Sequence, residues 1–214
     1  MRAWDLPTRV FHWAVVALVT VSWVSVDNGF MRLHLASGLG LMTLLLSRLA
    51  WGIVGSTTAR FTDFVTGPRR VIGYLKSLAT GDSPHFVGHN PAGGWMVVLM
   101  IALLLAQVAT GLFANDGVHF NGPLASQVSA DRSDWVTGLH ATLFNVLLLV
   151  VWIHLVAIFF YLWVKGDNLI RPMISGEKQG TEVPAAIKPS FLPLRAALPW
   201  VVLSAAVVWW VASH

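Results

Sequence analysis

Long apolar segments are the feature that most constrains the fold of this chain. A hydrocarbon core of roughly 30 Å is crossed by about 17 to 25 predominantly apolar residues. Four segments meet this length: 10–26, 33–53, 95–113 and 136–163. A fifth, 196–212, is at the lower limit. Only 11% of the 214 residues are charged, against roughly 25% in an average soluble domain. The chain is therefore predicted to be an all-α, multi-pass membrane protein in contact with lipid.

The basic residues sort to one side when the five segments alternate across the membrane. That side holds residues 1–9, 54–94 and 164–195. With Arg48 counted at its boundary, all but two of the 14 Lys and Arg residues lie there, and the exceptions are Arg32 and Arg132. An excess of Lys and Arg marks the cytoplasmic side, so the N-terminus is predicted to be cytoplasmic. Topology and lipid contact explain the net charge of +4, and no nucleic-acid binding is expected.

Two histidines interrupt the fourth apolar segment. His140 and His154 are fourteen residues apart, which in a helix corresponds to about 21 Å and almost four complete turns. They are therefore predicted to project from one face at opposite depths of the bilayer. An ionisable side chain inside a membrane span marks a functional site by default, although a single histidine can also be held structurally across a bundle.

Two further histidines complete one pair at each depth. The first segment enters from the cytoplasm with His12 near its start, at the depth of His154. The second segment enters from the outer side with His34 near its start, at the depth of His140. The sequence therefore predicts a cytoplasmic pair, His12 with His154, and an outer pair, His34 with His140.

Two imidazoles at each site restrict the group that the site can hold. Structural zinc generally takes four protein ligands, commonly with thiolates, whereas each pair offers two and the chain has no cysteine. A porphyrin supplies four equatorial nitrogens and leaves two axial positions for histidine. The resulting six-coordinate iron suits electron transfer, because no position remains for a substrate. Without cysteine, such a haem has to be held non-covalently.

Small residues beside His34 provide width for a flat ligand. Gly38 lies one helical turn after His34 on the same face, with Ser37 and Gly40 next to it. Ordinary close packing of membrane helices uses the same residue types. Together with the four histidines they favour space for a porphyrin, so Ser37 and Gly38 are predicted to contact the cofactor.

Four stretches resemble those of one known family: WDLPTRVFHW, HLASGLGL, GHNPAGG and LHATLFNVLLLVVWIHL. Through them, residues 1 to about 176 resemble the bacterial cytochrome b561 family, which is related to the b-type cytochrome subunits of nickel–iron hydrogenases. The resemblance implies a four-helix bundle in the bacterial inner membrane that carries two b haems. It also implies that the axial ligands are His12, His34, His140 and His154.

The predicted organisation has three parts. Residues 1–176 form the di-haem four-helix domain, 177–195 a cytoplasmic linker, and 196–214 an additional transmembrane helix. The last segment is expected outside the haem bundle, because residues 196–212 contain no histidine and follow a linker with Gly and Pro. The amphipathic stretch TGPRRVIGYLKSL predicts a helix in the membrane interface.

The resemblance further implies electron exchange between a quinone, ubiquinone or menaquinone, and a redox partner such as a periplasmic c-type cytochrome or an oxidoreductase subunit. It places Arg9 near a haem propionate, although a topology arginine whose charge reaches the interface explains this residue equally well. His89 is predicted to contact the quinone headgroup or to relay protons. Next to it, Asn90 and Pro91 suit the start of a helix.

Two other functions stay open at this point. One branch of the resembling family oxidises superoxide and reduces quinone without a partner, which would make the chain an enzyme in its own right. An anionic substrate favours a cationic approach, whereas the outer segments hold Arg32 and Arg132 against Asp27, Asp116, Asp131 and Asp134. A proton or metal transporter built on histidines is disfavoured by the few acids in the spans and by the lack of an inverted repeat.

The outer loop is expected to have one of two roles. The stretch NDGVHFNGPLASQVS is rich in turn residues but includes Val118, Phe120 and Leu124. These apolar side chains predict that the loop either covers the outer site or faces a docking protein.

Overall fold

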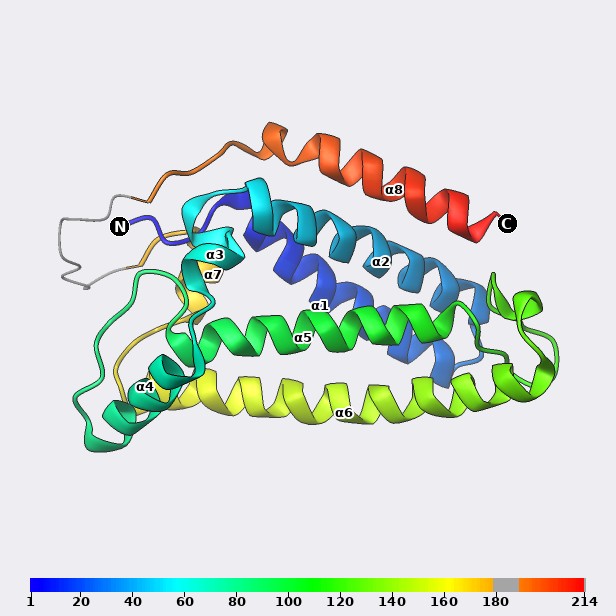
Figure 1. The fold of residues 1–214 in the computed structure, drawn as a ribbon, viewed down its shortest axis with the longest axis horizontal. Coiled ribbons are helices and arrows are strands. Elements are labelled where there is room, and N and C mark those ends of the chain that lie inside the picture. The colour runs from blue at the N-terminus through cyan, green and yellow to red at the C-terminus, as the bar shows by residue number, and fades with distance from the viewer. Residues whose placement is uncertain (179–188, 214) are drawn as a thin grey trace.

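The computed structural model describes residues 1–178 and 189–213. Four long helices form a bundle: α1 (Leu6–Asp27), α2 (Met31–Val54), α5 (Pro91–Gly111) and α6 (Ala130–Trp163). A fifth, α8 (Leu198–Ala212), runs alongside α2 (Figure 1). In the described part of the chain there is no β-strand. The four bundle helices, and α8 together with the turn before it (Leu194–Ala212, 19 residues), are long and apolar enough to cross a membrane. The prediction of an all-α, multi-pass protein is confirmed.

The local sequence explains where two of these helices begin. The Asp5 carboxylate accepts the backbone N–H of Thr8 at 2.8 Å and caps α1. The Asn90 side chain accepts the backbone N–H of Gly93 at 2.7 Å and caps α5, which starts at Pro91. Caps of this kind satisfy N–H groups that have no partner inside the helix. The cap predicted at Asn90 is confirmed.

Helix α6 is longer than the predicted span 136–163, because it begins at Ala130. Its 34 residues correspond to about 51 Å, well beyond the roughly 30 Å of a hydrocarbon core. Asp131 lies in its first turn, where a negative charge is favourable. Asp131 and Asp134 therefore belong to helix α6. The sequence had suggested instead that they belong to the outer loop. Asn115 of that loop donates to the Asp134 carboxylate at 2.8 Å.

The two ends of the bundle differ in what they carry (Figure 1). One end, called here the basic end, holds the N-terminus and the short elements η1 (Thr57–Ala59), α3 (Phe61–Phe64), α4 (Pro68–Thr80) and α7 (Ile170–Ser175). The other, called the loop end, holds the α1–α2 turn and residues 112–129, which include η2 (Ala125–Gln127). The C-terminal end of α8 lies at the loop end, and η3 (Leu194–Ala196) precedes α8 at the basic end.

An apolar core lies between the two ends. Its buried residues come from α2, α5 and α6: Leu41, Leu45, Ile101, Leu104, Val108 and Leu147. The start of α8 packs separately: Ala197, which precedes the helix, and Trp200 lie in one cluster with Trp51 and Ala59. The core therefore separates His34 and His140 at the loop end from His12 and His154 at the basic end.

The predicted linker 177–195 lies in large part outside the described residues, but its two ends are held by the bundle. Lys178 is 5% exposed and pairs with Asp167 at 2.7 Å. Ser190 accepts the backbone N–H of Thr57 through its carbonyl at 3.1 Å. The residues at both ends of this stretch therefore pack on the basic end and do not extend freely from it.

Helix α4 forms where the sequence predicts an interfacial helix. It packs through Tyr74, which is buried, whereas Ile72 and Leu75 are 54% and 48% exposed. Arg69 and Arg70 are exposed as well. This helix therefore presents both apolar and basic side chains away from the bundle, as a helix lying in a membrane interface does.

Candidate functional site

A cavity of about 380 Å³ lies between α1, α2, α5 and α6 near the loop end. Its volume is within the roughly 300 to 1,000 Å³ of small-molecule sites. His34 and His140 both line it, together with Gly38. Phe120 also lines it, so the loop contributes to the cavity wall, which is the covering role that the sequence had offered as one of two alternatives.

The rings of His34 and His140 have the separation of two ligands to one metal ion. Their centroids are 6.1 Å apart and their planes are inclined by 85°. A metal–imidazole bond of about 2 Å places two opposed ligand nitrogens about 4 Å apart, and a ring radius of about 1 Å at each end gives about 6 Å between centroids. The observed separation therefore fits axial ligation of a single iron.

Backbone carbonyls orient both of these rings. Nδ1 of His34 lies 2.9 Å from the carbonyl oxygen of Ser22, and Nδ1 of His140 lies 3.0 Å from that of Gln107. A carbonyl can only accept, so each Nδ1–H donates to it, and Nε2 carries no hydrogen. Nε2 of His140 accepts from the side-chain amide of Gln107 at 3.1 Å, so that amide has to turn away before this nitrogen can bind a metal. Hydrogen bonds of this kind fix the tautomer and orientation of metal-binding histidines.

The glycines of this region have different roles. A Cβ on Gly38 would meet no atom within 4 Å, so Gly38 opens space in the cavity wall. A Cβ on Gly40 would lie 3.3 Å from Leu18, which makes Gly40 a contact between α1 and α2. A Cβ on Gly111 would lie 3.0 Å from Cε1 of His140. Sequence reasoning missed Gly111, because its proximity to His140 depends on how α5 packs against α6.

Ser37 does not line the cavity that Gly38 opens. It is 3% exposed, and its hydroxyl donates to the carbonyl oxygen of His34 at 2.9 Å within α2. The structure therefore brings Gly38 to the cavity and leaves Ser37 in the helix packing.

His12 and His154 lie at the basic end, on α1 and α6. The two rings are close enough for the charge on one to act on the other. Nδ1 of His12 is buried and has no hydrogen-bond partner among residues 1–178 and 189–213. His12 thus lacks the kind of backbone hydrogen bond that orients each ring of the loop-end pair.

His89 lies near this second pair. Its ring packs between Trp4 and Phe64, with centroid distances of 4.6 and 4.5 Å. Burial, with the charges of Arg48 and His154, lowers the pKa of His89 to about 3, so the ring is neutral at physiological pH. Its Nδ1 is buried and finds no hydrogen-bond partner in the described part of the chain, although the residue as a whole keeps some exposed surface.

Arg9 connects α1 to α7. Its guanidinium donates to the carbonyl oxygen of Ile174, and the Trp13 indole donates to that of Met173 at 3.0 Å. Arg9 lies one turn before His12, as the sequence indicates, but part of its hydrogen-bonding capacity is used to hold α7 in place.

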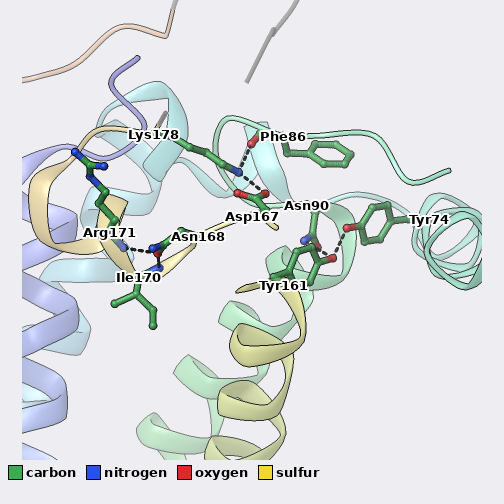
Figure 2. A network of polar contacts seen from close by, with 9 residues as sticks. All are labelled: Tyr74, Phe86, Asn90, Tyr161, Asp167, Asn168, Ile170, Arg171 and Lys178. Atoms are coloured by element: carbon green, nitrogen blue, oxygen red, sulfur yellow. Dashed lines mark hydrogen bonds and ion pairs between the residues drawn. The ribbon is translucent and has the colours of Figure 1, made fainter. Parts of the chain in front are cut away.

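A polar network that the sequence did not reveal joins three elements at the basic end (Figure 2). The hydroxyls of Tyr74 on α4 and Tyr161 on α6 are hydrogen-bonded, and the Asn90 side chain donates to Tyr161 at 3.0 Å. Burial and the hydrogen bond with Tyr161 raise the pKa of Tyr74. The phenol therefore stays protonated. Nearby, Lys178 bridges Asp167 and the carbonyl oxygen of Phe86 (Figure 2).

Comparison with known families agrees with this arrangement. A family model described as prokaryotic cytochrome b561 matches residues 3–176. The chain belongs to the prokaryotic cytochrome b561 family. The comparisons with curated proteins and with solved structures give no match. As a cytochrome b561, the protein carries electrons across a membrane through b-type haem, and the family that the sequence resembles is confirmed.

The donor set of this cytochrome b561 fits a haem better than a metal ion held by protein alone. Among the described residues, no three His, Cys, Asp or Glu side chains come together as a metal site. Two histidines with an adjoining cavity suffice when a porphyrin supplies the other four ligands. The loop-end histidines provide this arrangement, with the Gln107 amide at 3.1 Å from Nε2 of His140 as the protein group that an iron would displace.

Proposed function

We propose that this cytochrome b561 holds two b haems, one between His34 and His140 at the loop end and one between His12 and His154 at the basic end. The observation that carries the proposal is the loop-end pair, whose rings are 6.1 Å apart at a cavity. The basic-end pair follows from the fourteen-residue spacing on α6, which repeats the same face about 21 Å along the helix. A haem between His12 and His140 would have to bridge most of that distance.

Each haem supplies a one-electron carrier, and the residues of the chain determine how it is held. The imidazole Nε2 atoms of His34 and His140 would hold the loop-end iron, and the carbonyls of Ser22 and Gln107 hold those rings in place. Two histidines leave no iron position for a substrate, which suits electron transfer. The cavity lining is mainly apolar, with Leu104 and Phe144 among its residues, so it shields the carrier from water.

The proposed orientation of the chain in a bacterial inner membrane places the basic end on the cytoplasmic side and the loop end on the periplasmic side. All but two of the 14 Lys and Arg residues belong to the basic side, which the positive-inside rule makes cytoplasmic. At the loop end, backbone N–H groups of Phe120, Val118 and His119 donate to Asp116 and lower its pKa. The exposed acids there suit a basic redox partner, such as a c-type cytochrome, better than an anionic substrate such as superoxide.

The proposed substrate on the cytoplasmic side is a membrane quinone, ubiquinone or menaquinone, bound near His89. This histidine is neutral, and its buried Nδ1 has no partner in the described part of the chain, so with its proton on Nδ1 it can donate to a quinone oxygen. Its neighbours Trp4 and Phe64 offer an aromatic wall. Arg9, one turn from His12, remains a candidate for contact with a haem propionate.

Spectra of single variants test the haem assignment. Purified wild-type protein should contain two haems per chain, visible in the reduced-minus-oxidised absorbance spectrum and in a redox titration. His34→Ala and His140→Ala should remove or perturb one component, and His12→Ala and His154→Ala the other. The assignment fails if His12→Ala and His140→Ala affect the same component.

Kinetics test the quinone site separately. His89→Ala should slow the reduction of haem by quinol while leaving the haem spectrum unchanged. His85→Ala is the matched control, because His85 is exposed on the same segment. Equal rates for His89→Ala and wild type would remove His89 from the quinone site.

A further inference from the structure

Arg48 occupies a position on α2 that corresponds to the position of His154 on α6. It follows His34 by fourteen residues, the same interval that separates His140 from His154. Fourteen residues return almost to the same helix face about 21 Å further on. Helix α2 therefore carries His34 to the loop-end site and Arg48 to the depth of the basic-end pair.

Contacts place Arg48 at the basic end, next to residues that adjoin the histidine pair in sequence or in space. Its guanidinium lies 5.0 Å from the ring centroid of Phe61 and 6.0 Å from that of Phe11, the residue before His12. Its charge also lowers the pKa of His89, and so does the charge of His154. The cation therefore lies at the basic end, next to Phe11 of α1, Phe61 of α3 and the carbonyl of Ala59.

The hydrogen bonds of Arg48 leave part of its charge without a partner. The side chain is buried, with the residue 3% exposed. Nη2 donates to the carbonyl oxygen of Ala59 at 3.0 Å, but Nη1 is buried and has no partner among residues 1–178 and 189–213. A buried cation is costly unless an anion and further hydrogen bonds compensate it.

The charge of Asp5 favours the Arg48 cation but compensates it only in part, because the two side chains form no ion pair. Asp5 already accepts the backbone N–H of Thr8 and the indole N–H of Trp51 at 3.0 Å. In the described part of the chain, Arg48 forms no ion pair with a carboxylate. An anion that belongs to the ligand, and not to the protein, fits the remaining N–H groups.

We propose that Arg48 binds a carboxylate of the haem at the basic end, and that its charge raises the reduction potential of that haem. This inference rests on the proposed ligation of that haem by His12 and His154. A planar guanidinium matches a carboxylate with two parallel hydrogen bonds. A lipid phosphate is a less suitable anion, because the residue is buried beneath Phe61 and the chain around Ala59.

The direction of the effect on the potential follows from electrostatics. Reduction adds one negative charge to the haem, and a fixed positive charge nearby stabilises the reduced form. Arg48 therefore stabilises the reduced form of the basic-end haem. No arginine or lysine lines the loop-end cavity, so the two haems differ in their nearest fixed charge.

Redox titrations of the purified, haem-loaded protein test this role. Arg48→Gln should shift the equilibrium for reduction of the basic-end component at least tenfold toward the oxidised form, which is about 59 mV for one electron, and leave the loop-end component unchanged. Arg48→Lys should shift it less, because the charge remains. Arg60→Gln is the matched control, since Arg60 is exposed at the same end and pairs with Asp63. Equal shifts of both components, or none in Arg48→Gln, would overturn the inference.

A second experiment needs no variant and identifies the anion. The full-length chain, produced without haem, is loaded with haem b or with its dimethyl ester, which has no free carboxylate. The ester should bind at least tenfold more weakly at the basic end and with little change at the loop end. Equal affinity at the basic end would overturn the inference, and would assign the anion to another source such as a lipid phosphate.

His154→Ala separates this inference from the proposed function. If it leaves both haem components in place, the ligand assignment itself is wrong. If it removes the basic-end component while Arg48→Gln leaves the potential unchanged, only the role of Arg48 is wrong.

Discussion

The two ends of the bundle hold their polar side chains in different ways. Eight buried side-chain nitrogen or oxygen atoms in the described residues have no hydrogen-bond partner, and only that of Gln107 belongs to the loop end. The others lie at the basic end, on Thr8, Arg9, His12, Arg48, Thr58, Thr66 and His89. At the loop end, by contrast, backbone carbonyls bind Nδ1 of both His34 and His140.

This difference shows which of the two sites is held in its geometry by protein groups alone. A buried polar group without a partner costs about 1 to 3 kcal/mol, so the basic end depends on groups that the chain does not supply. At the loop end, backbone carbonyls orient the histidine rings and Phe120 of the loop lines the cavity. We infer that the protein itself fixes the orientation of the loop-end rings, and that a bound ligand completes the basic-end site.

Filling the loop-end cavity should have the largest effect. Gly38→Phe places a ring in the cavity wall that Gly38 opens, and should lower the haem content from two to about one per chain. Haem and protein assays of the purified variant measure this. The remaining component should be the one that His154→Ala removes.

Gly138→Phe is the control for this substitution. Gly138 lies on α6 near the same end, has no atom within 4 Å of a Cβ, and does not line the cavity. It should keep both haems. If Gly138→Phe loses haem as readily as Gly38→Phe, the loss reflects general disturbance and the cavity is not the site.

Removal of the cofactor should affect the two ends unequally. In full-length protein made without haem, backbone hydrogen exchange at the basic end, residues 5–12 and 56–66, should accelerate roughly tenfold or more relative to residues 112–129. The reason is that uncompensated buried polar groups destabilise the basic end by about 1 to 3 kcal/mol each, and about 1.4 kcal/mol is a factor of ten. Greater acceleration in 112–129 would reverse the comparison.

The sequence predicted the helices and the histidine depths because both depend on local patterns. Apolar length identified five spans, and helical periodicity placed His140 and His154 on one face. It also predicted the helix that α4 forms. The extension of α6 to Ala130 was missed, because Asp131 and Asp134 are as compatible with a loop as with the first turns of a helix.

Contacts between segments far apart in the chain could not be predicted from the sequence. Gly111 approaches His140 only through the packing of α5 on α6. Arg48 was counted as a topology residue, although its fourteen-residue interval from His34 was available as a signal. The Tyr74–Tyr161 contact joins residues 87 positions apart, and no periodicity relates them.

A moderate effect is expected from Asp5, which ties α1 to α2 at the basic end. Its carboxylate caps α1 and accepts the Trp51 indole at 3.0 Å, and the residue is fully buried. Asp5→Asn keeps one acceptor but turns a donor toward the indole N–H, so it should destabilise the protein by about 1 to 3 kcal/mol. Thermal unfolding of the purified protein measures this, with Asp82→Asn, exposed at the same end, as the control.

The Asp5 substitution also tests whether the two ends behave independently. Because Asp5 is the acidic group whose charge acts on Arg48, its neutralisation should perturb the basic-end haem and leave the loop-end haem unchanged. Equal perturbation of both haems would show that the two ends are coupled more tightly than their separate hydrogen bonds indicate.

The smallest effect is expected from the tyrosine pair, which is the part of the basic end whose polar groups are satisfied. Tyr161→Phe removes the hydroxyl that binds Tyr74 and accepts from Asn90 (Figure 2). The expected cost is about 1 kcal/mol, seen as faster hydrogen exchange in α4 with an unchanged haem spectrum. Tyr74→Phe should give a similar change, and the double variant should cost less than the sum, because both single changes break one shared contact. Should Tyr161→Phe instead shift the potential of the basic-end haem, the network acts on the redox site, and the completion of that site would include protein hydroxyls as well as ligand.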